Sequence, residues 1–241
     1  MKISVIGIGP GEKEQMTFKA LEAIKNADVI VGYKTYIDLV SELITDKEVV
    51  QNGMKREIDR CEEAVRRYRL GENVAVISSG DPGVYGMAGL VMELVNEAEA
   101  DDVEIIPGVS ASCSCASILG APLMHDFATI SLSDLLTPWE LIQKRVKLAA
   151  EGDFVIAIYN PKSKGRPHHL QTVQEILLTV RDKATPVGIV NKAGREGQSD
   201  VITTLENLHL ADVNMFSTVI VGNSNTFVKG NRMVTPRGYK V

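Results

Sequence analysis

Short apolar runs alternate with amphipathic stretches along this chain, and the alternation predicts its elements. In the first half, the runs have the length of buried strands and lie at residues 2–6, 29–31, 74–77 and 103–106. Between them, residues at helical spacing predict helices that begin near Thr17 and cover residues 36–44, 57–70, 87–95 and 110–119. Thr17 is the predicted N-cap of the first helix, and Gly71 is predicted to end the third. Strands that alternate with helices indicate a doubly wound α/β domain with a mostly parallel sheet.

The pattern changes at Gly120-Ala121-Pro122, where we expect a second domain to begin. Its predicted strands lie at residues 128–132, 154–159, 187–190, 201–204 and 218–221. Its predicted helices lie at residues 138–150 and 170–180. The last strands follow one another with little helix between them, which indicates a mixed α/β sheet. The sequence therefore predicts an N-terminal domain over residues 1–119 and a C-terminal domain over residues 120–241.

Two glycine-rich turns directly follow two of the predicted strands. The first is Gly7-Ile8-Gly9-Pro10-Gly11, and the second is Ser79-Gly80-Asp81-Pro82-Gly83-Val84-Tyr85-Gly86. Each turn leads into a helical pattern. In a parallel α/β sheet, ligands bind where loops leave the carboxyl ends of the strands. Two such loops in one domain predict a small-molecule site.

The sequence of the first turn is similar to that of a dinucleotide-binding loop, but it lacks the key residues of that motif. Glu12 stands where that motif has its third glycine, and its charge would repel a pyrophosphate. Pro10 removes a backbone N–H that a phosphate would use. The acidic residue that binds a ribose should end the second strand, whereas Asp28 lies at its start. The turn therefore favours a ligand without a pyrophosphate, and an NAD-type oxidoreductase is kept as the disfavoured alternative.

Composition narrows the class of protein. The 241 residues are 44% apolar and 24% charged with a net charge of −5, which is typical of a globular protein and disfavours a nucleic-acid partner. No apolar run approaches the ~20 residues of a membrane span, and no signal-peptide pattern precedes the first strand. Together with the low cysteine count (Cys61, Cys113 and Cys115), this predicts a cytoplasmic protein without membrane contact.

Cysteine and histidine, the usual ligands of zinc, are few in this sequence. Cys113 and Cys115 are too closely spaced for a usual zinc pair, and small residues on a packed helix explain them better. The four histidines have no ligand spacing, and the adjacent pair His168-His169 is expected in a solvated loop. No metal site belonging to the protein is therefore expected.

The motifs described so far, with several others, resemble those of the tetrapyrrole methylases, which use S-adenosylmethionine. The resemblance covers essentially the whole chain. It rests on the two glycine turns and on Met16-Thr17, Pro107-Gly108-Val109-Ser110-Ala111, Tyr159-Asn160-Pro161 and Thr185-Pro186-Val187. It implies a two-domain methylase fold with the cofactor in a cleft between the domains, and a homodimer. S-adenosylmethionine has no phosphate, which agrees with the absence of a pyrophosphate-binding pattern in the first turn.

Within this family, longer strings resemble the branch that methylates C17 of precorrin-3B or cobalt-factor III in cobalamin (corrin) biosynthesis. They lie at residues 120–127, 131–139, 194–197 and 235–239. The resemblance implies contraction of the ring with expulsion of C20, to give (cobalt-)precorrin-4, and we favour the cobalt-bound substrate. Two further functions stay open at this point: a sister methylase that acts at another ring carbon, and a tetrapyrrole carrier without catalysis.

The resemblance also implies which residues line the S-adenosylmethionine site. They are Gly9, Pro10, Gly11, Ser79, Gly80, Asp81, Val84, Tyr85, Ser110, Ala111, Asn160 and Ala193. The Asp81 carboxylate could accept hydrogen bonds from the ribose or the ammonium group and attract the sulfonium. It could equally hold the Pro82-Gly83 turn in shape as an Asx turn, and the two roles are compatible.

The ring contraction implied by the resemblance requires proton transfers, for which His125, Asp126 and Asp134 are the candidate acids and bases. A surface position for His125 and a turn or helix-cap role for Asp134 are the alternatives. The carboxylates of a tetrapyrrole need cations, and the candidates follow predicted strands: Lys162, Lys164, Arg166, Lys192 and Arg195, with Arg237 as a further one. Trp139 is expected in the core or at an interface.

Overall fold

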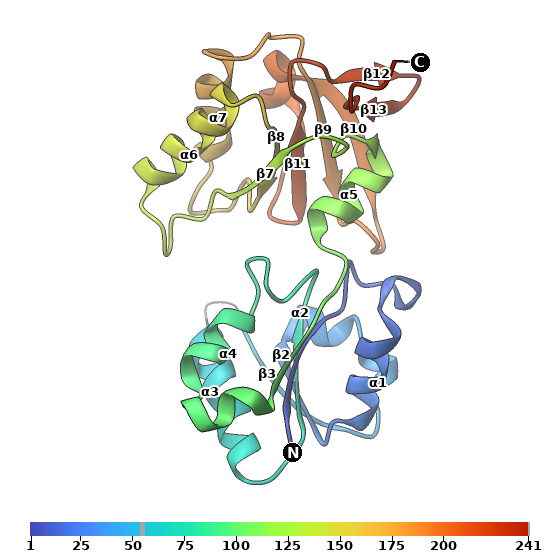
Figure 1. Cartoon of the computed structure of the whole chain (residues 1–241), viewed down its shortest axis with the longest axis vertical. Coiled ribbons are helices and arrows are strands. Elements are labelled where there is room, and N and C mark those ends of the chain that lie inside the picture. Colours follow the sequence, from blue (N-terminus) through green and yellow to red (C-terminus); the bar gives the residue numbers. More distant parts are fainter. Residues whose placement is uncertain (54–55, 241) are drawn as a thin grey trace. The chain divides into compact units, whose positions relative to one another are not determined.

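The computed structural model describes residues 1–53 and 56–240 of the chain. These residues form two compact units, Met1–Ala111 and Ser112–Val241. Each unit contains its own five-stranded sheet with helices on both faces, as Figure 1 shows for each separately. The predicted α/β fold class, with one parallel and one mixed sheet, is confirmed.

The sheet of the first unit is entirely parallel, with strand order β3-β2-β4-β1-β5. Its strands are β1 (Ile3–Gly7), β2 (Val29–Tyr33), β3 (Glu48–Asn52), β4 (Val74–Ser78) and β5 (Val103–Ile106). Its α-helices are α1 (Phe18–Asn26), α2 (Lys34–Asp38), α3 (Glu57–Arg69) and α4 (Ala88–Leu94). Short 3-10 helices lie at η1 (Lys13–Gln15), η2 (Ser41–Leu43) and η3 (Glu97–Asp102).

Alternation along the strands explains the layers of this unit. Ile3 and Val5 of β1 pack into one apolar cluster with α3 and α4, whereas Ile6 packs into a second cluster with α1 and α2. Both clusters are fully buried because helices cover both faces, which is why the strands read as continuous apolar runs. All carboxyl ends of these strands lie at one edge of the sheet, since the strands are parallel.

The predicted helix ends are confirmed, and one predicted helix is wrong in extent. The Thr17 hydroxyl accepts a hydrogen bond from the Ala20 amide at 3.1 Å, and Gly71 follows α3 with a φ of +93°. Instead of one helix over residues 36–44, the chain forms α2 and then the 3-10 turn η2. Strand β3 was not predicted, because it is a half-exposed edge strand with polar residues at both ends.

The sheet of the second unit is mixed, with strand order β10-β9-β11-β8-β7. Its strands are β7 (Phe127–Ser131), β8 (Val155–Tyr159), β9 (Pro186–Asn191), β10 (Ser199–Thr204) and β11 (Ser217–Val221). A smaller sheet joins β6 (Gly120–Ala121), β12 (Phe227–Lys229) and β13 (Arg232–Val234). The helices are α5 (Ala111–Leu119), α6 (Trp139–Glu151), α7 (His169–Leu178) and the 3-10 segment η4 (Leu205–Leu210). Helices α6 and α7 cover one face of the five-stranded sheet, and α5 packs on the other (Figure 1).

Helix α5 lies with the second unit rather than the first. Its residues Cys115 and Leu119 pack against Val155, Val190 and Ile220 of the mixed sheet. Burial raises the pKa of the Cys115 thiol to about 11, as expected for a packed thiol without a functional role. The contact division therefore falls at residues 111 and 112, whereas the predicted domain boundary lies at the C-terminal end of α5.

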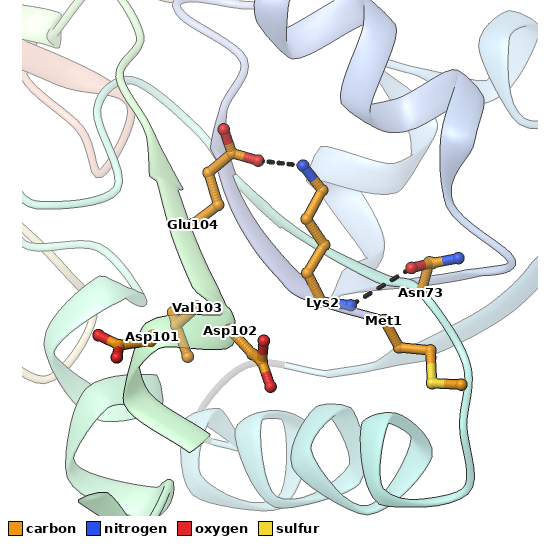
Figure 2. Close-up of a pocket in the computed structure, with 7 residues that line it drawn as sticks. All are labelled: Met1, Lys2, Asn73, Asp101, Asp102, Val103 and Glu104. Carbon is orange, nitrogen blue, oxygen red and sulfur yellow. Dashed lines mark hydrogen bonds and ion pairs between the residues drawn. The ribbon is translucent and has the colours of Figure 1, made fainter. Parts of the chain in front are cut away.

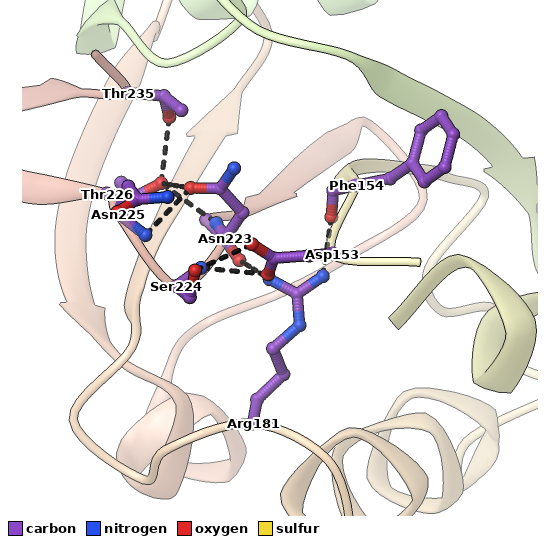
Figure 3. Close-up of polar contacts among 9 residues, drawn as sticks. Asp153, Phe154, Arg181, Asn223, Ser224, Asn225, Thr226 and Thr235 are labelled. Atoms are coloured by element: carbon purple, nitrogen blue, oxygen red, sulfur yellow. Dashed lines mark hydrogen bonds and ion pairs between the residues drawn. The ribbon is translucent and has the colours of Figure 1, made fainter. Parts of the chain in front are cut away.

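A buried arginine joins three loops at one end of the second unit (Figure 3). Arg181, whose side chain is 3% exposed, donates hydrogen bonds to the carbonyls of Gly222 at 2.8 Å and Phe154 at 2.7 Å. Its Nη1 lies 3.2 Å from Asp153, and Asp153 in turn accepts hydrogen bonds from Ser224. The network therefore fixes the turn before β8 against the turn after β11 through one cation.

No helix in the described parts of the chain has both the length and the apolar character needed to cross a membrane.

Candidate active site

The two glycine turns of the first unit are hydrogen-bonded to each other. Gly9 N donates to Gly80 O at 3.1 Å, and Gly80 N donates to Gly9 O at 2.8 Å. Both glycines have positive φ, +65° and +67°, which a side chain would disfavour. These reciprocal bonds join the turn after β1 to the turn after β4 at the carboxyl edge of the sheet.

A third loop, after β5, closes against the first two. A Cβ atom on Gly108 would lie 2.3 Å from Gly80 O and 2.6 Å from Gly7 O, and one on Gly7 would lie 2.6 Å from Gly80 O. All of these neighbours are backbone atoms, which cannot rotate away. Three backbone segments therefore meet at a distance that only glycine permits.

Asp81 holds the same three-loop arrangement through its carboxylate. One oxygen accepts a hydrogen bond from Gly83 N at 2.8 Å, and the other accepts one from Gly108 N at 3.2 Å. The first is the predicted Asx turn, which the structure confirms. The second, which the sequence did not indicate, ties the turn after β4 to the loop after β5. A carboxylate has further lone pairs beyond these two bonds, so the predicted contact with a ribose or an ammonium group stays compatible with them.

The geometry of these loops suits a ligand without phosphates. A phosphate-binding turn presents free backbone N–H groups, whereas those of Gly9 and Gly80 each donate to the other residue's carbonyl and that of Ile8 donates to Ser78 O at 2.9 Å. This agrees with S-adenosylmethionine and disfavours the NAD alternative. Beside the turns, Val84 and Tyr85 are exposed and offer apolar and aromatic surface, while Pro10 is buried. Gly11, Ser79, Ser110 and Ala111 lie in or next to the same three loops at intermediate exposure.

In the second unit, strand directions bring a further group of predicted residues to one edge. Strand β7 is parallel to β8, and β8 and β9 are both antiparallel to β11, so the carboxyl ends of β7, β8 and β9 share an edge. Asn160 directly follows β8, and Lys192 and Ala193 follow β9. Asn160 and Lys192 both have left-handed backbones, with φ of +50° and +49°. The chain therefore adopts a left-handed backbone directly after β8 and directly after β9, the two places in this unit where cofactor residues were predicted.

Asp134 lies at this edge in a cluster of polar groups. One of its oxygens is 3.0 Å from His169 Nε2, and the other is 3.7 Å from Arg166 Nε. Partial burial opposes ionisation, but the His169 hydrogen bond and the charges of His169 and Arg166 outweigh it and lower the pKa of the Asp134 carboxyl. Asp134 is therefore held as a carboxylate rather than as a proton donor.

His169 was predicted in a solvated loop, and that prediction is wrong. It begins α7, its side chain is 18% exposed, and its ring lies 3.9 Å from that of Trp139 between centroids. Trp139 is partly buried against the core of the second unit, as predicted. The pairing of His169 with Asp134 was missed because the partners are 35 residues apart. The sequence did contain one signal for this pairing. Asp134 follows β7 and His169 follows β8, and the two strands are parallel, so both residues come after strands that end at the same edge.

The other catalytic candidates lie elsewhere. His125 and Asp126 directly precede β7, so they are at the opposite edge of the mixed sheet from Asp134 and Asn160. His125 Nδ1 accepts a hydrogen bond from the Asp126 amide at 2.8 Å, and both side chains are exposed. The structure therefore does not bring the three candidates together.

The predicted cations differ in how accessible they are. Lys162, Lys164, Lys192 and Arg237 are exposed, and Arg195 is half-buried. Arg166 is mostly buried, at 11% side-chain exposure, and bonds to protein carbonyls. Three of the five predicted strand-end cations, Lys162, Lys164 and Lys192, are thus exposed where an anionic ligand can reach them.

A hollow of about 610 Å³ lies at the amino edge of the first sheet, away from these loops (Figure 2). Its lining includes Asp101, Asp102 and Glu104. Lys2 lies across it, paired with Glu104 and bonded through its backbone to Asn73. Three carboxylates would repel an anionic tetrapyrrole, and ligands of parallel sheets bind at the carboxyl edge. We therefore assign the site to the glycine loops.

Comparison with known proteins agrees with the fold. The model of the family Tetrapyrrole (Corrin/Porphyrin) Methylases matches residues 2–209. The chain therefore belongs to the tetrapyrrole methylases. Over 238 residues it is 53% identical to the probable cobalt-factor III C(17)-methyltransferase of Salmonella typhimurium, covering 98% of this chain and 99% of that one. It is 51% identical to the cobalt-factor III methyltransferase of Priestia megaterium and spans 45% of that longer chain.

Two solved structures extend the comparison. The methyltransferase CobJ has a TM-score of 0.87 and 34% identity, with 98% of this chain and 99% of that chain covered. The uroporphyrin-III C-methyltransferase of Thermus thermophilus, complexed with S-adenosylhomocysteine, has a TM-score of 0.74 and 25% identity over 92% of this chain and 97% of its own.

Proposed function

We propose that this methylase transfers a methyl group from S-adenosylmethionine to C17 of cobalt-factor III, or of the metal-free precorrin-3B, in cobalamin biosynthesis. The named activity of the Salmonella relative, which matches over nearly the full length of both chains, supports the position of methylation. The strings at residues 120–127 and 131–139 that resemble this branch support it over a sister methylase.

The observation that carries the proposal is the Gly9–Gly80 pairing. It joins the loops after β1 and β4 into one surface in which the N–H groups of Gly9 and Gly80 are already used. Such a surface can take an adenosine and an amino-acid group closely, but it offers no cradle for a pyrophosphate. A cofactor with a positive sulfonium also gains from the Asp81 carboxylate beside it.

In the proposed reaction, the cofactor supplies an activated methyl group on sulfur. Gly9, Gly80 and Gly108 allow close approach, Asp81 orients polar groups, and Val84 and Tyr85 exclude water. Asn160 and Ala193 are proposed as further cofactor residues on the strength of the family resemblance. Because an electron-rich ring carbon attacks the methyl group directly, alignment of carbon, methyl and sulfur provides most of the acceleration.

The proposed substrate carries many carboxylates, and the exposed and half-buried cations at strand ends suit them. Lys162 and Lys164 follow β8, and Lys192 and Arg195 follow β9. The overall charge of −5 would otherwise repel such a substrate, so local cations are required. A non-catalytic carrier would use the same cations but would have no use for the glycine loops.

The test is calorimetric titration of the native chain and of Asp81→Ala with S-adenosylhomocysteine. We expect the native chain to bind and Asp81→Ala to bind at least tenfold more weakly, because the Gly83 and Gly108 amides lose their acceptor. Glu93→Ala, which removes an exposed carboxylate of α4, serves as the control for a general loss of negative charge. Absence of binding to the native chain would refute the methylase function.

The role of the base in the proton transfers of the ring contraction is proposed for Asp134, which is held as a carboxylate, with His125 and Asp126 as the remaining candidates. Asp134 is favoured because it shares an edge with Asn160, whereas His125 and Asp126 lie at the opposite edge of the sheet. We expect Asp134→Asn to lower the yield of ring-contracted product by about 100-fold, the usual range for loss of acid–base catalysis. Absorption and mass spectra of the product measure this, with His125→Ala assayed in parallel. A loss confined to His125→Ala would move the role to His125.

A homodimer in the cytoplasm completes the proposal. The cysteines Cys61, Cys113 and Cys115 are all free, which supports a reducing compartment. The dimer is supported by the family resemblance.

A further inference from the structure

The guanidinium of Arg166 joins the ends of two neighbouring strands. Its Nη1 donates to Leu132 O at 2.7 Å, just after β7, and to Asn160 O at 3.4 Å, just after β8. The side chain is 11% exposed, so little of its surface faces solvent. A single buried nitrogen therefore connects the two chain segments that leave this edge of the mixed sheet.

The residue held in this way has a left-handed backbone. Asn160 has a φ of +50°, a conformation that asparagine adopts more readily than most residues but at a higher cost than glycine. Its side chain is fixed as well, because Nδ2 donates to Ser131 Oγ at 2.9 Å. Both the carbonyl and the amide side chain of Asn160 are thus tied to the end of β7.

A supporting arm holds Arg166 itself. Asp134 lies 3.7 Å from Arg166 Nε and 3.0 Å from His169 Nε2, and the His169 ring lies against that of Trp139 at the start of α6, tilted by 40°. The ionised Asp134 balances the charge of the guanidinium. The contacts run continuously from Trp139 through His169, Asp134 and Arg166 to Asn160, which is proposed to contact the cofactor.

We propose that Arg166 is a positioning residue that holds the turn at Asn160 in the geometry needed for cofactor binding, rather than a ligand of the substrate carboxylates. The inference rests on the proposed function, since Asn160 belongs to its cofactor site. It also replaces the role that the sequence predicted for Arg166. The two roles differ in what they control, because a positioning residue affects cofactor affinity and a carboxylate ligand affects the KM of the tetrapyrrole.

The first experiment compares Arg166→Gln, Arg166→Lys and Lys164→Gln. We expect Arg166→Gln to weaken S-adenosylhomocysteine binding about tenfold by calorimetry, with a smaller rise in the KM for cobalt-factor III. Arg166→Lys keeps a donor but loses the fork toward Asp134, so partial recovery of affinity is expected. Lys164→Gln, an exposed cation in the same loop, should instead raise the KM and leave cofactor affinity unchanged.

The second experiment is a double-mutant cycle with Asn160→Gly. Glycine adopts a left-handed backbone without strain, so Arg166 has less to hold in that background. We expect Arg166→Gln to weaken cofactor binding several-fold less in Asn160→Gly than in the native background. Equal losses in the two backgrounds would overturn the proposal, as would an Arg166→Gln effect confined to the KM of the tetrapyrrole.

Hydrogen exchange separates this inference from the proposed function. If the native chain does not bind S-adenosylhomocysteine, the proposed function fails. Faster amide exchange of a peptide covering residues 159–164 in Arg166→Lys, without ligand and below its unfolding temperature, still supports a positioning role. Unchanged exchange in that peptide overturns it. Because this readout needs only the folded chain, Arg166→Lys also covers the case in which Arg166→Gln fails to fold.

Discussion

Gly108→Ala is expected to abolish measurable S-adenosylhomocysteine binding and to destabilise the protein by about 3 kcal/mol, the upper range for an overpacked site. The added Cβ would lie 2.3 Å from Gly80 O and 2.6 Å from Gly7 O, so all three loops must move. Calorimetric titration and chemical denaturation measure the two effects.

Two other glycines provide matched controls for this variant. Gly80→Ala meets nothing closer than the Ala111 amide at 3.6 Å, so only its positive φ is strained and a cost of about 1 kcal/mol is expected. Gly89→Ala lies in α4 with open space around the new methyl group, and a better helix former there should stabilise slightly. If Gly108→Ala costs no more than Gly80→Ala, the close approach of the loops is not what holds the site.

Arg181→Met is expected to lower the free energy of unfolding by about 3 kcal/mol, because two buried carbonyls lose a charged donor. The methionine fills much of the same volume, so the loss reports on the hydrogen bonds to Gly222 and Phe154 rather than on a cavity. Denaturant titration followed by circular dichroism measures it. S-adenosylhomocysteine affinity should change little below the unfolding transition, because Arg181 lies outside the loops of the proposed site.

The comparison for Arg181 is a cation on the surface of the same unit. Lys147 pairs with Glu151 at 3.8 Å on α6, and both side chains are exposed. Lys147→Met should leave the unfolding midpoint almost unchanged, since exposed ion pairs contribute little. Similar losses for the two variants would mean that the buried network is not a special source of stability.

The sequence predicted well the elements whose burial is complete. Strands β1, β2 and β4 are almost entirely buried between two helical layers, so their residues form clear apolar runs. The edge strand β5 is only partly buried, but three of its four residues are apolar and it was predicted as well. Strand β3 is a partly exposed edge strand, and the short strands β12 and β13 form a largely exposed pair. None of the three has a clear apolar run. Their formation depends on the neighbour to which each pairs, and this is a property of the fold rather than of the local sequence.

The site was predicted in part for the same reason. The glycine loops follow their strands directly, so local pattern located them. The bond from Gly108 to Asp81 and the pairing of His169 with Asp134 join segments 27 and 35 residues apart, which local pattern cannot reveal. The position of His125 could have been predicted from the sequence, however, because a residue that directly precedes a strand lies at the amino end of that strand.

The reciprocal bonds between Gly9 and Gly80 have a consequence for the energetics of ligand capture. They involve only main-chain atoms and exist before any ligand arrives, so the two loops have already lost much of their conformational freedom during folding. A ligand that docks on such a surface orders little additional chain, and this preorganisation raises affinity without adding contacts. Because these two bonds use no side-chain atoms, neighbouring side chains such as Val84 and Tyr85 can be replaced without removing either bond, whereas Asp81 supplies a separate link between the loops.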